Sequence, residues 1–259
     1  MSWQYLFGLS FLIVLGYMTV IWLISLAKRD SSIVDIFWGL GFVVLAVVYY
    51  FLTSGFPGRK ALVTALVVLW GLRLSTRIFL RNWSREEDFR YRAWREAAGK
   101  TYWWYSYFQV FLLQGAIMWL IVTPVLTAQF NALPDHFTFF DLFGGLVWGV
   151  GFFFEAVGDW QLDRFKSDPA NKGQLMRSGL WAYTRHPNYF GDAMVWWGFF
   201  LLALGTPGGF WTVYSPILMT WLLTRVSGVA MLEKAMIETK PGYKDYVENT
   251  NDFFPWFPR

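Results

Sequence analysis

The sequence predicts an all-α, polytopic membrane protein with about seven transmembrane helices, its N-terminus outside and its C-terminus inside. Of its 259 residues, 56% are hydrophobic and only 15% are charged. A soluble domain carries about a quarter charged residues, so this chain could not cover its surface with polar side chains. Trp, Tyr and Phe make up 22% of the chain, which suits the two interfaces of a bilayer.

Seven stretches are apolar and long enough, or nearly so, to cross roughly 30 Å of hydrocarbon as helices. The predicted helices are 4–27, 33–52, 61–80, 107–127, 141–160, 189–205 and 210–229. We expect one membrane domain over 1–259. Its inner side would carry two longer connections, 81–106 and 161–188, and a cytoplasmic tail, 230–259.

The basic residues set the predicted orientation. All Lys and Arg residues except Arg59 and Lys60 fall in the connections, tail or helix ends that an N-outside, C-inside topology places on the inner side. This is the pattern of the positive-inside rule. The net charge of +4 therefore follows from topology, and we expect no nucleic acid among the partners.

The cysteine and histidine content restricts the possible chemistry. The chain has no cysteine, which excludes disulfides, thiolate metal ligands and cysteine nucleophiles. Its two histidines, His136 and His186, are too few for a histidine-rich metal site. We expect no metal.

Arginines recur at every fourth residue of the third predicted helix, and carboxylates do the same at the end of the fifth, so each set lies on one helical face. The arginines are Arg73, Arg77, Arg81 and Arg85, and the carboxylates are Glu155, Asp159 and Asp163. Like charges four residues apart repel, so either the stripes pair with each other or an anionic ligand lies among the arginines. Snorkelling explains the lower arginines but not Arg73. Because charged side chains inside a membrane span are costly unless they are paired or hydrated, these stripes favour a polar cavity that opens to the cytoplasm.

Asp35 lies at the predicted inner start of the second helix. The structural interpretation is an acid favoured by the helix dipole. The functional one is a catalytic acid that donates a proton or polarises a substrate carbonyl, with Glu155 as the next candidate. Gln114, inside the fourth helix, fits a hydrogen-bonding packing residue.

One run in the second long connection combines several groups that bind ligands. Pro187 permits a helix to start, which places Arg185 and His186 at a helix N-terminus that attracts phosphate. Asn188 and Tyr189 then occupy the first turn. The run is GLWAYTRHPNYFGD, residues 179–192.

Its core, RHPNYFG at 185–191, resembles the signature of a membrane superfamily that contains steroid 5-alpha-reductases, sterol reductases and isoprenylcysteine carboxyl methyltransferases. The fuller pattern is similar to the bacterial steroid 5-alpha-reductase-like branch, from about residue 30 to the C-terminus. The further motifs are SIVD at 32–35, WG at 38–39, WGLRL at 70–74, EDFRY at 87–91 and the stretch 159–173. The RHPNYFG match is specific for the superfamily and not for the reaction.

This resemblance implies an NADPH-dependent oxidoreductase, in a bacterial inner membrane, that reduces a conjugated carbon–carbon double bond in a steroid- or isoprenoid-like lipid. Asp35 approximately matches an acid that the reductases place near the substrate carbonyl. Arg185 and His186 would lie at the cofactor phosphates. The residues implied in cofactor binding are Arg77, Asp159, Asn171, Lys172, Arg185, His186, Asn188, Tyr189, Asp192 and Glu233.

The C-terminal tail also fits a second cofactor, S-adenosylmethionine. Glu233, Tyr243, Tyr246 and Pro255 look like the methyltransferase tail, although the second acid of that tail is Lys234 here. The alternative is thus an S-adenosylmethionine-dependent lipid or isoprenoid methyltransferase. A non-enzymatic lipid-binding or transport protein is the second alternative. In each case the partners are the bilayer and a hydrophobic small molecule, and the sequence leaves the oligomeric state open.

Overall fold

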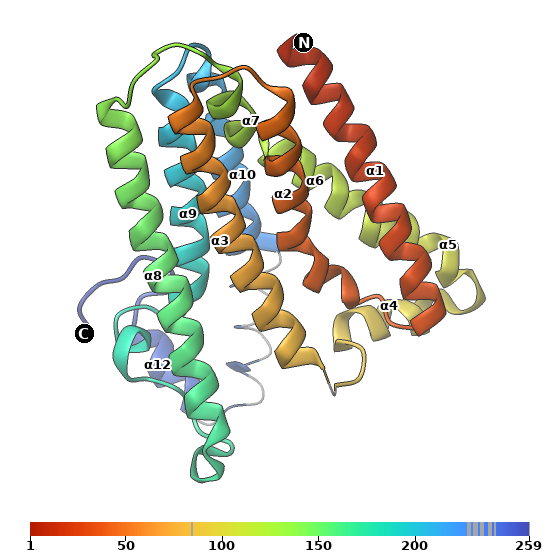
Figure 1. Cartoon of the computed structure of the whole chain (residues 1–259). Coiled ribbons are helices and arrows are strands. Elements are labelled where there is room, and N and C mark those ends of the chain that lie inside the picture. The colour runs from red at the N-terminus through yellow and green to blue at the C-terminus, as the bar shows by residue number, and fades with distance from the viewer. Residues whose placement is uncertain are drawn as a thin grey trace. The chain divides into compact units, whose positions relative to one another are not determined.

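The computed structural model describes residues 1–83, 85–226, 229, 233, 236–237, 240 and 242–258, and within them the chain is helical without a β-strand. It divides into two compact units (Figure 1). The N-terminal unit is Met1–Thr138 with Ala203–Thr212, and the C-terminal unit is Phe139–Leu202 with Val213–Arg259. The single domain over 1–259 stays a prediction.

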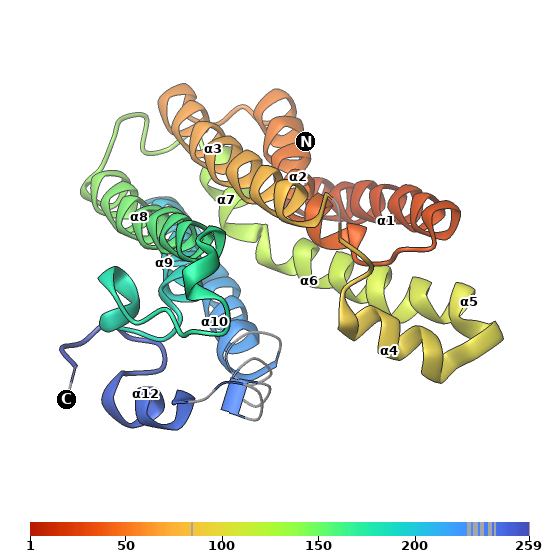
Figure 2. The ribbon, with the colours of Figure 1, turned by 90° about the horizontal axis from the view of Figure 1, so that it is seen from below.

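The N-terminal unit is built on three long helices, of which α2 packs against both α1 and α3 (Figures 1 and 2). A short helical hairpin follows, and the chain then returns through a nearly continuous helical path. The elements are α1 Trp3–Lys28, α2 Ile33–Leu52, α3 Pro57–Asn82, α4 Phe89–Ala98, η1 Gly99–Thr101, α5 Tyr102–Ser106, η2 Tyr107–Leu112, α6 Leu113–Ile121 and α7 Thr123–Phe130.

The C-terminal unit is built on α8, α9 and α10 (Figure 1), and Tyr246 of the tail helix α12 donates its hydroxyl to the carbonyl of Trp181, in the segment before α9. Trp197 of α9 donates its indole N–H to Thr220 of α10 at 3.2 Å. The elements are α8 Phe139–Ser167, η3 Pro169–Asn171, η4 Gly179–Ala182, α9 Pro187–Leu204, η5 Gly209–Val213, α10 Tyr214–Trp221, η6 Leu222–Val226 and α12 Tyr243–Asn249. The last residues of α9 and most of η5 belong to the N-terminal unit.

Several helices are suited to a bilayer. Among the described residues, five helical segments are long and apolar enough to cross a membrane: Trp3–Lys28, Ile33–Leu52, Pro57–Asn82, Phe89–Phe130 and Phe139–Ser167. These segments support a multi-pass membrane protein. The total of seven spans and the orientation stay predictions. Of the predicted helix 210–229, residues 227 and 228 lie outside the described residues.

The predicted boundaries hold well for the apolar helices and less well for the polar connections. The predicted helix 33–52 coincides with α2. The connection 81–106 contains α4 and α5, because Tyr91 and Tyr102 are each 3% exposed and anchor these short helices. The connection 161–188 begins later than predicted, since α8 continues to Ser167.

Glycines allow the central helices of each unit to touch. A Cβ added to Gly39 of α2 would lie 2.6 Å from the carbonyl oxygen of Gly71 on α3. On α8, a Cβ added to Gly151 would lie 2.6 Å from the carbonyl oxygen of Gly191 on α9. Small residues at such crossings let helix backbones pack closely inside a membrane.

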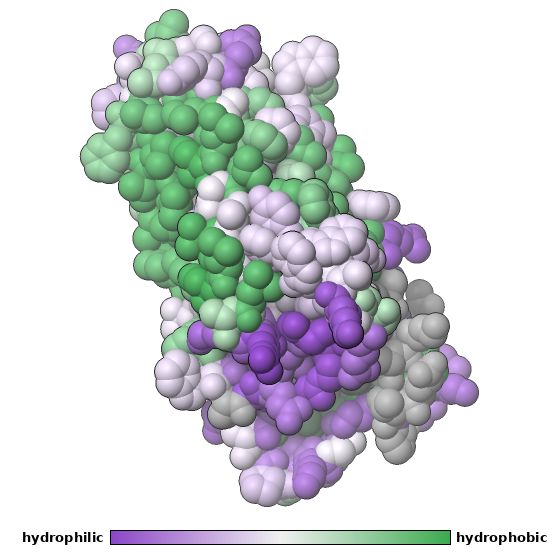
Figure 3. Space-filling view, turned by 90° about the vertical axis from the view of Figure 1, so that its right-hand side faces the viewer, coloured by the Kyte–Doolittle hydropathy of each residue, from purple (hydrophilic) through white to green (hydrophobic). Residues whose placement is uncertain are grey.

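Large apolar side chains are divided between the core and the outer faces of the helices. Phe42 and Trp70 are fully buried, whereas Leu12 and Phe51 are 61% and 77% exposed. On the face drawn in Figure 3, hydrophobic residues form a broad region above a hydrophilic patch. Apolar exposure on this scale is typical of helices that face lipid.

Candidate functional site

Asp35 lies in the first turn of α2, at the positive end of the helix dipole. The preceding residues prepare the start of this helix. Asp30 Oδ1 accepts hydrogen bonds from the backbone N–H of Ser32 at 2.8 Å and from its hydroxyl at 2.6 Å. Such Asp-centred turns offer the backbone an alternative to helical hydrogen bonds. The turn at Asp30 therefore ends α1 and defines where α2 begins. The side chain of Asp35 is 21% exposed.

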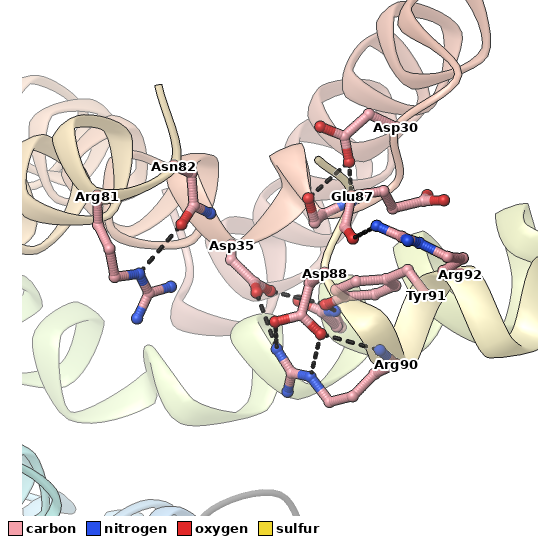
Figure 4. A network of polar contacts seen from close by, with 11 residues as sticks. Asp30, Asp35, Arg81, Asn82, Glu87, Asp88, Arg90, Tyr91 and Arg92 are labelled. Atoms are coloured by element: carbon pink, nitrogen blue, oxygen red, sulfur yellow. Dashed lines mark hydrogen bonds and ion pairs between the residues drawn. The ribbon is translucent and has the colours of Figure 1, made fainter. Parts of the chain in front are cut away.

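Two side chains of α4 converge on Asp35 (Figure 4). Tyr91 donates its hydroxyl proton to Oδ1 at 2.7 Å, and Arg90 donates from Nη2 to Oδ2 at 3.2 Å. Gln114 of α6 donates from Nε2 to the Tyr91 hydroxyl oxygen at 3.3 Å. The carboxylate is therefore held between a phenol and a guanidinium, and a third helix orients the phenol.

Arg90 connects Asp35 to Asp88. The Nε of Arg90 donates to Asp88 Oδ1 at 2.9 Å, and its backbone N–H donates to the same oxygen at 3.0 Å, which makes Asp88 the N-cap of α4. Burial raises the pKa of Asp88, but the hydrogen bonds from Arg90 outweigh burial and hold that pKa below its usual value. Asp88 is thus ionised at neutral pH and fixes the start of α4.

A second ion pair secures the far end of α4. Glu87 accepts two hydrogen bonds from Arg95, at 2.9 and 2.8 Å, and one from the backbone N–H of Ser31 at 2.7 Å. The Arg95 guanidinium also lies 4.4 Å from the ring centroid of Tyr102, whose hydroxyl donates to Ser31. Both ends of α4 are therefore attached at the start of α2, which fixes the position of Tyr91.

The second polar cluster, in the C-terminal unit, is centred on Arg185, which is 7% exposed. Its Nε donates to Glu233 Oε1 at 2.7 Å, and its Nη1 donates to the carbonyls of Val247, at 3.0 Å, and Thr250. Its backbone N–H donates to the carbonyl of Asn251 at 2.9 Å. The carbonyls of Val247 and Thr250 lie in and just after the last turn of α12, so the guanidinium caps that helix.

His186 approaches the same carboxylate. Its Nε2 lies 3.2 Å from Glu233 Oε1, and its ring stacks on Tyr189 with centroids 5.5 Å apart. Burial raises the pKa of Glu233, but the hydrogen bonds from His186 and Arg185 outweigh it and lower that pKa below its usual value. Burial raises the pKa of Tyr243 to about 12. At neutral pH, Glu233 is therefore an anion and Tyr243 a neutral phenol.

The predicted carboxylates of α8 lie where this helix packs on the first turns of α9. Glu155 and Asp159 are each 3% exposed. A Cβ added to Gly158 would lie 3.4 Å from the backbone nitrogen of Asn188, and one added to Gly191 would meet the backbone of Glu155. The structure thus brings the backbone around Asp159 next to the start of α9. That start carries Asn188, Tyr189 and Asp192.

The remaining predicted residues lie elsewhere. Asn171 donates its side-chain amide to the carbonyl of Phe165 at 3.0 Å, and Lys172 beside it is exposed. Arg77 is on α3, so the predicted cofactor residues are divided between the two units, as are the catalytic candidates Asp35 and Glu155. These roles stay predictions. Within the described part of the chain, no group of three or more His, Asp and Glu residues could hold a metal ion.

The sequence did not point to Tyr91 and Arg90 as partners of Asp35. Both belong to the EDFRY run at 87–91, whose signal in the sequence is a resemblance to a family motif. Because 81–106 was predicted as a connection, no helical face was available on which to place them. An acid suited to a helix N-cap, Asp88, with an aromatic residue three positions later, Tyr91, is the local signal that points to α4.

Comparison with known proteins identifies the family. A family model described as "Protein of unknown function (DUF1295)" matches residues 21–250, which include both polar clusters. The chain belongs to the DUF1295 family. It is 24% identical over 280 residues to "Uncharacterized protein C594.04c" of Schizosaccharomyces pombe, a match that covers 96% of this chain and 78% of that protein. No solved structure matches it. Since this relative is from a yeast, a bacterial inner membrane stays a prediction.

Proposed function

We propose that this DUF1295 protein is an NADPH-dependent reductase of a conjugated carbon–carbon double bond in a hydrophobic, steroid- or isoprenoid-like lipid. The observation that carries the proposal is the hydrogen bond of 2.7 Å between Tyr91 and Asp35, next to the Arg90 guanidinium. A carboxyl and a phenol at one end of an apolar helix bundle are groups that can act on the carbonyl of an apolar substrate.

The reaction adds a hydride to one carbon of the double bond and a proton to its neighbour, and negative charge develops on the conjugated carbonyl oxygen. NADPH would supply the hydride when bound. In this chain, Tyr91 and Asp35 would hydrogen-bond the carbonyl oxygen and deliver the proton. Arg90 would stabilise the carboxylate that remains, and Gln114 would keep the phenol oriented.

The residues around the start of α9 suit the sugar part of NADPH. Asp159, Asn188 and Asp192 offer acceptors and donors for ribose hydroxyls and for a carboxamide. They lie on α8 and α9, which are held together by glycine contacts. A rigid helix pair of this kind is a suitable base for a binding site.

The phosphates require cations. The Arg185 guanidinium is engaged with Glu233 and with carbonyls at the end of α12. We therefore propose Lys172 as a phosphate ligand of the C-terminal unit, and propose that Arg185 and His186 act by holding Glu233 in place. The cofactor role of Arg77, in the N-terminal unit, stays a prediction.

One observation favours the second candidate, an S-adenosylmethionine-dependent methyltransferase. In the described part of the C-terminal unit, the side chains of Glu155 and Asp159 are buried, and that of Glu233 is 18% exposed. Arg185 is buried beside Glu233. S-adenosylmethionine carries sulfonium and ammonium cations, whereas NADPH carries several phosphate charges. Carboxylates attract such cations, so these three acids favour the cationic cofactor.

Ligand-dependent stability separates the candidates. The melting temperature of the purified protein is to be measured with NADPH, NADH and S-adenosylmethionine, because a ligand that binds only the folded state raises it. We expect NADPH to raise it and S-adenosylmethionine to leave it unchanged. The opposite preference would replace the reductase by the methyltransferase. No response to either would favour the remaining alternative, a lipid-binding or transport protein.

The predicted role of Arg77 in cofactor binding has its own test. We expect Arg77→Ala to reduce the preference for NADPH over NADH, since the 2′-phosphate distinguishes the two. Arg92→Ala is the matched control, because Arg92 is an exposed arginine paired with Glu86 on the protein surface. An unchanged preference in Arg77→Ala would remove Arg77 from the site.

A further inference from the structure

The end of the tail displays a cluster of large aromatic rings. We call it the terminal aromatic patch: Tyr183, Phe254, Trp256 and Phe257, whose exposed fractions are 42%, 68%, 67% and 72%. None of residues 253–258 is charged. So much exposed aromatic surface without charge is costly in water and indicates a contact with something apolar.

Hydrogen bonds hold the patch in place. The backbone N–H of Trp256 donates to the carbonyl of Tyr183 at 2.9 Å, and the hydroxyl of Thr184 donates to the carbonyl of Phe253 at 2.9 Å. The rings of Tyr183 and Phe257 also meet edge to face, with centroids 6.1 Å apart. The rings are therefore exposed because the fold directs them outward.

The patch is continuous with the apolar side of α8. Phe254 packs edge-on against Phe190 at 6.1 Å, and Phe190 packs against Phe154 of α8 at 5.0 Å. The neighbouring α8 side chains Phe153 and Trp160 are 52% and 57% exposed. Both belong to a helix long and apolar enough to cross a membrane.

The charges of α8 indicate how deep the patch lies. From Phe154 the helix continues for about 20 Å to its end at Ser167, at 1.5 Å per residue. Its basic residues, Arg164 and Lys166, come only at that end, where the Arg164 guanidinium lies 5.5 Å from the ring centroid of Trp160. Trp and Arg at such a position mark the interface between hydrocarbon and water. The Phe254 contact is thus on the apolar side of, or at, that interface.

We propose that the terminal aromatic patch inserts into the bilayer interface and anchors the tail to the membrane. Aromatic rings with polar edges are favoured at this depth, and an uncharged segment can enter it. The occupant is lipid, because the patch continues a lipid-facing helix surface. Since the same tail supplies the carbonyls that bind Arg185, the anchor also fixes the Arg185–Glu233 cluster relative to the membrane surface.

The chain contains no cysteine, so the depth of single positions can be measured directly. Phe257→Cys and Pro258→Cys variants are to be spin-labelled and reconstituted into phosphatidylcholine–phosphatidylglycerol vesicles. Pro258→Cys leaves all four rings in place. Power-saturation EPR then compares the accessibility of each label to oxygen, which partitions into lipid, and to a water-soluble nickel chelate. Leu146→Cys, on the exposed apolar side of α8, is the lipid control, and Glu248→Cys, on the exposed side of α12, is the water control.

We expect both tail labels to be more accessible to oxygen than to nickel, as Leu146→Cys is, but at a shallower depth. Preferential access of the nickel chelate, as at Glu248→Cys, would contradict the proposal and place the patch in water. Low accessibility to both reagents would also contradict it, because the patch would then be buried against protein, such as a second copy of the chain.

Discussion

Arg90 in the N-terminal unit and Arg185 in the C-terminal unit both contact carboxylates, but their other partners differ. The side chain of Arg90 is 27% exposed and donates to the side chains of Asp35 and Asp88. Arg185 is 7% exposed and divides its donors between Glu233 and backbone carbonyls of the tail. Side-chain partners can exchange protons or move when a substrate arrives, whereas backbone carbonyls cannot take up a proton.

This difference assigns separate tasks to the two clusters. The Asp35 cluster has a carboxyl, a phenol and a cation within hydrogen-bonding distance, as an acid–base site requires. The Arg185 cluster joins α9, α12 and Glu233, as a structural joint beside a binding site would. We therefore expect mutations in the first to change turnover and mutations in the second to change stability and binding.

The largest expected effect is the loss of turnover in the Asp35→Asn variant. Loss of a positioned acid lowers the rate by about 10² to 10⁴-fold, and we expect cofactor affinity to change little because Asp35 belongs to the proposed substrate side. Steady-state reductase assays and a binding titration measure the two quantities. Asp135→Asn, at an exposed residue, is the control. If Asp35→Asn kept its activity, the acid would have to be sought at Glu155.

The next effect is on stability. Arg185→Ala removes one of the two described partners of Glu233 and the donor to the carbonyls of Val247 and Thr250. Breaking such a buried pair costs about 3–5 kcal/mol in the free energy of unfolding. Arg164→Ala, at an exposed residue, should cost less than about 1 kcal/mol. Chemical denaturation measures both, and limited proteolysis shows whether the tail detaches. A stable Arg185→Ala protein with impaired cofactor binding would instead make Arg185 a direct ligand.

A smaller effect on stability is expected from helix packing, and two glycines of α8 provide a matched pair of substitutions. Gly151→Ala forces a Cβ toward the backbone of α9 and should destabilise the protein by about 1–3 kcal/mol. Gly149→Ala, where nothing lies within 4 Å of the added carbon, should be neutral or slightly stabilising. Thermal denaturation compares the two. Equal effects would mean that the close α8–α9 contact does not support the second cluster.

The smallest effect is the pH dependence of stability. Because the folded-state pKa of Glu233 is lowered, its contribution is present above the unfolded value of about 4.3 and is lost as pH falls through the folded pKa. Glu233→Gln should remove this acid-side loss in the C-terminal unit. Asp88→Asn should do the same for the N-terminal unit. Stability curves between pH 3 and 7 that coincide for wild type and variants would contradict these ion pairs.

The apolar helices could be predicted from sequence because their signals are local. The helix 33–52 is an uninterrupted apolar run that begins after Asp30-Ser31-Ser32 and ends before Gly55 and Pro57, and α2 has these bounds. The short helix α4 could not be predicted in this way, since its stability depends on contacts with Ser31 and Asp35 more than 50 residues earlier in the chain.

The candidate site was predictable only in part, for the same reason. Asp35 and Arg185 stood out as ionisable or helix-start residues, and each is central to a cluster. Their partners did not stand out, because Tyr91 and the tail carbonyls approach them only through tertiary packing. A local pattern identifies a polar residue in an apolar segment, and the fold decides which group neutralises it.

Hydride transfer tests the central claim most directly. Vesicles containing the wild-type protein or Asp35→Asn are to be incubated with NADPH deuterated at C4 and either a steroid 4-en-3-one or a polyprenyl enal, and the lipids analysed by mass spectrometry. We predict that wild type forms a product with one fewer double bond and one deuterium, and that Asp35→Asn, although it binds NADPH, forms at least about 100-fold less. The account would be contradicted if wild type transferred no deuterium to either lipid, or if Asp35→Asn transferred as much as wild type.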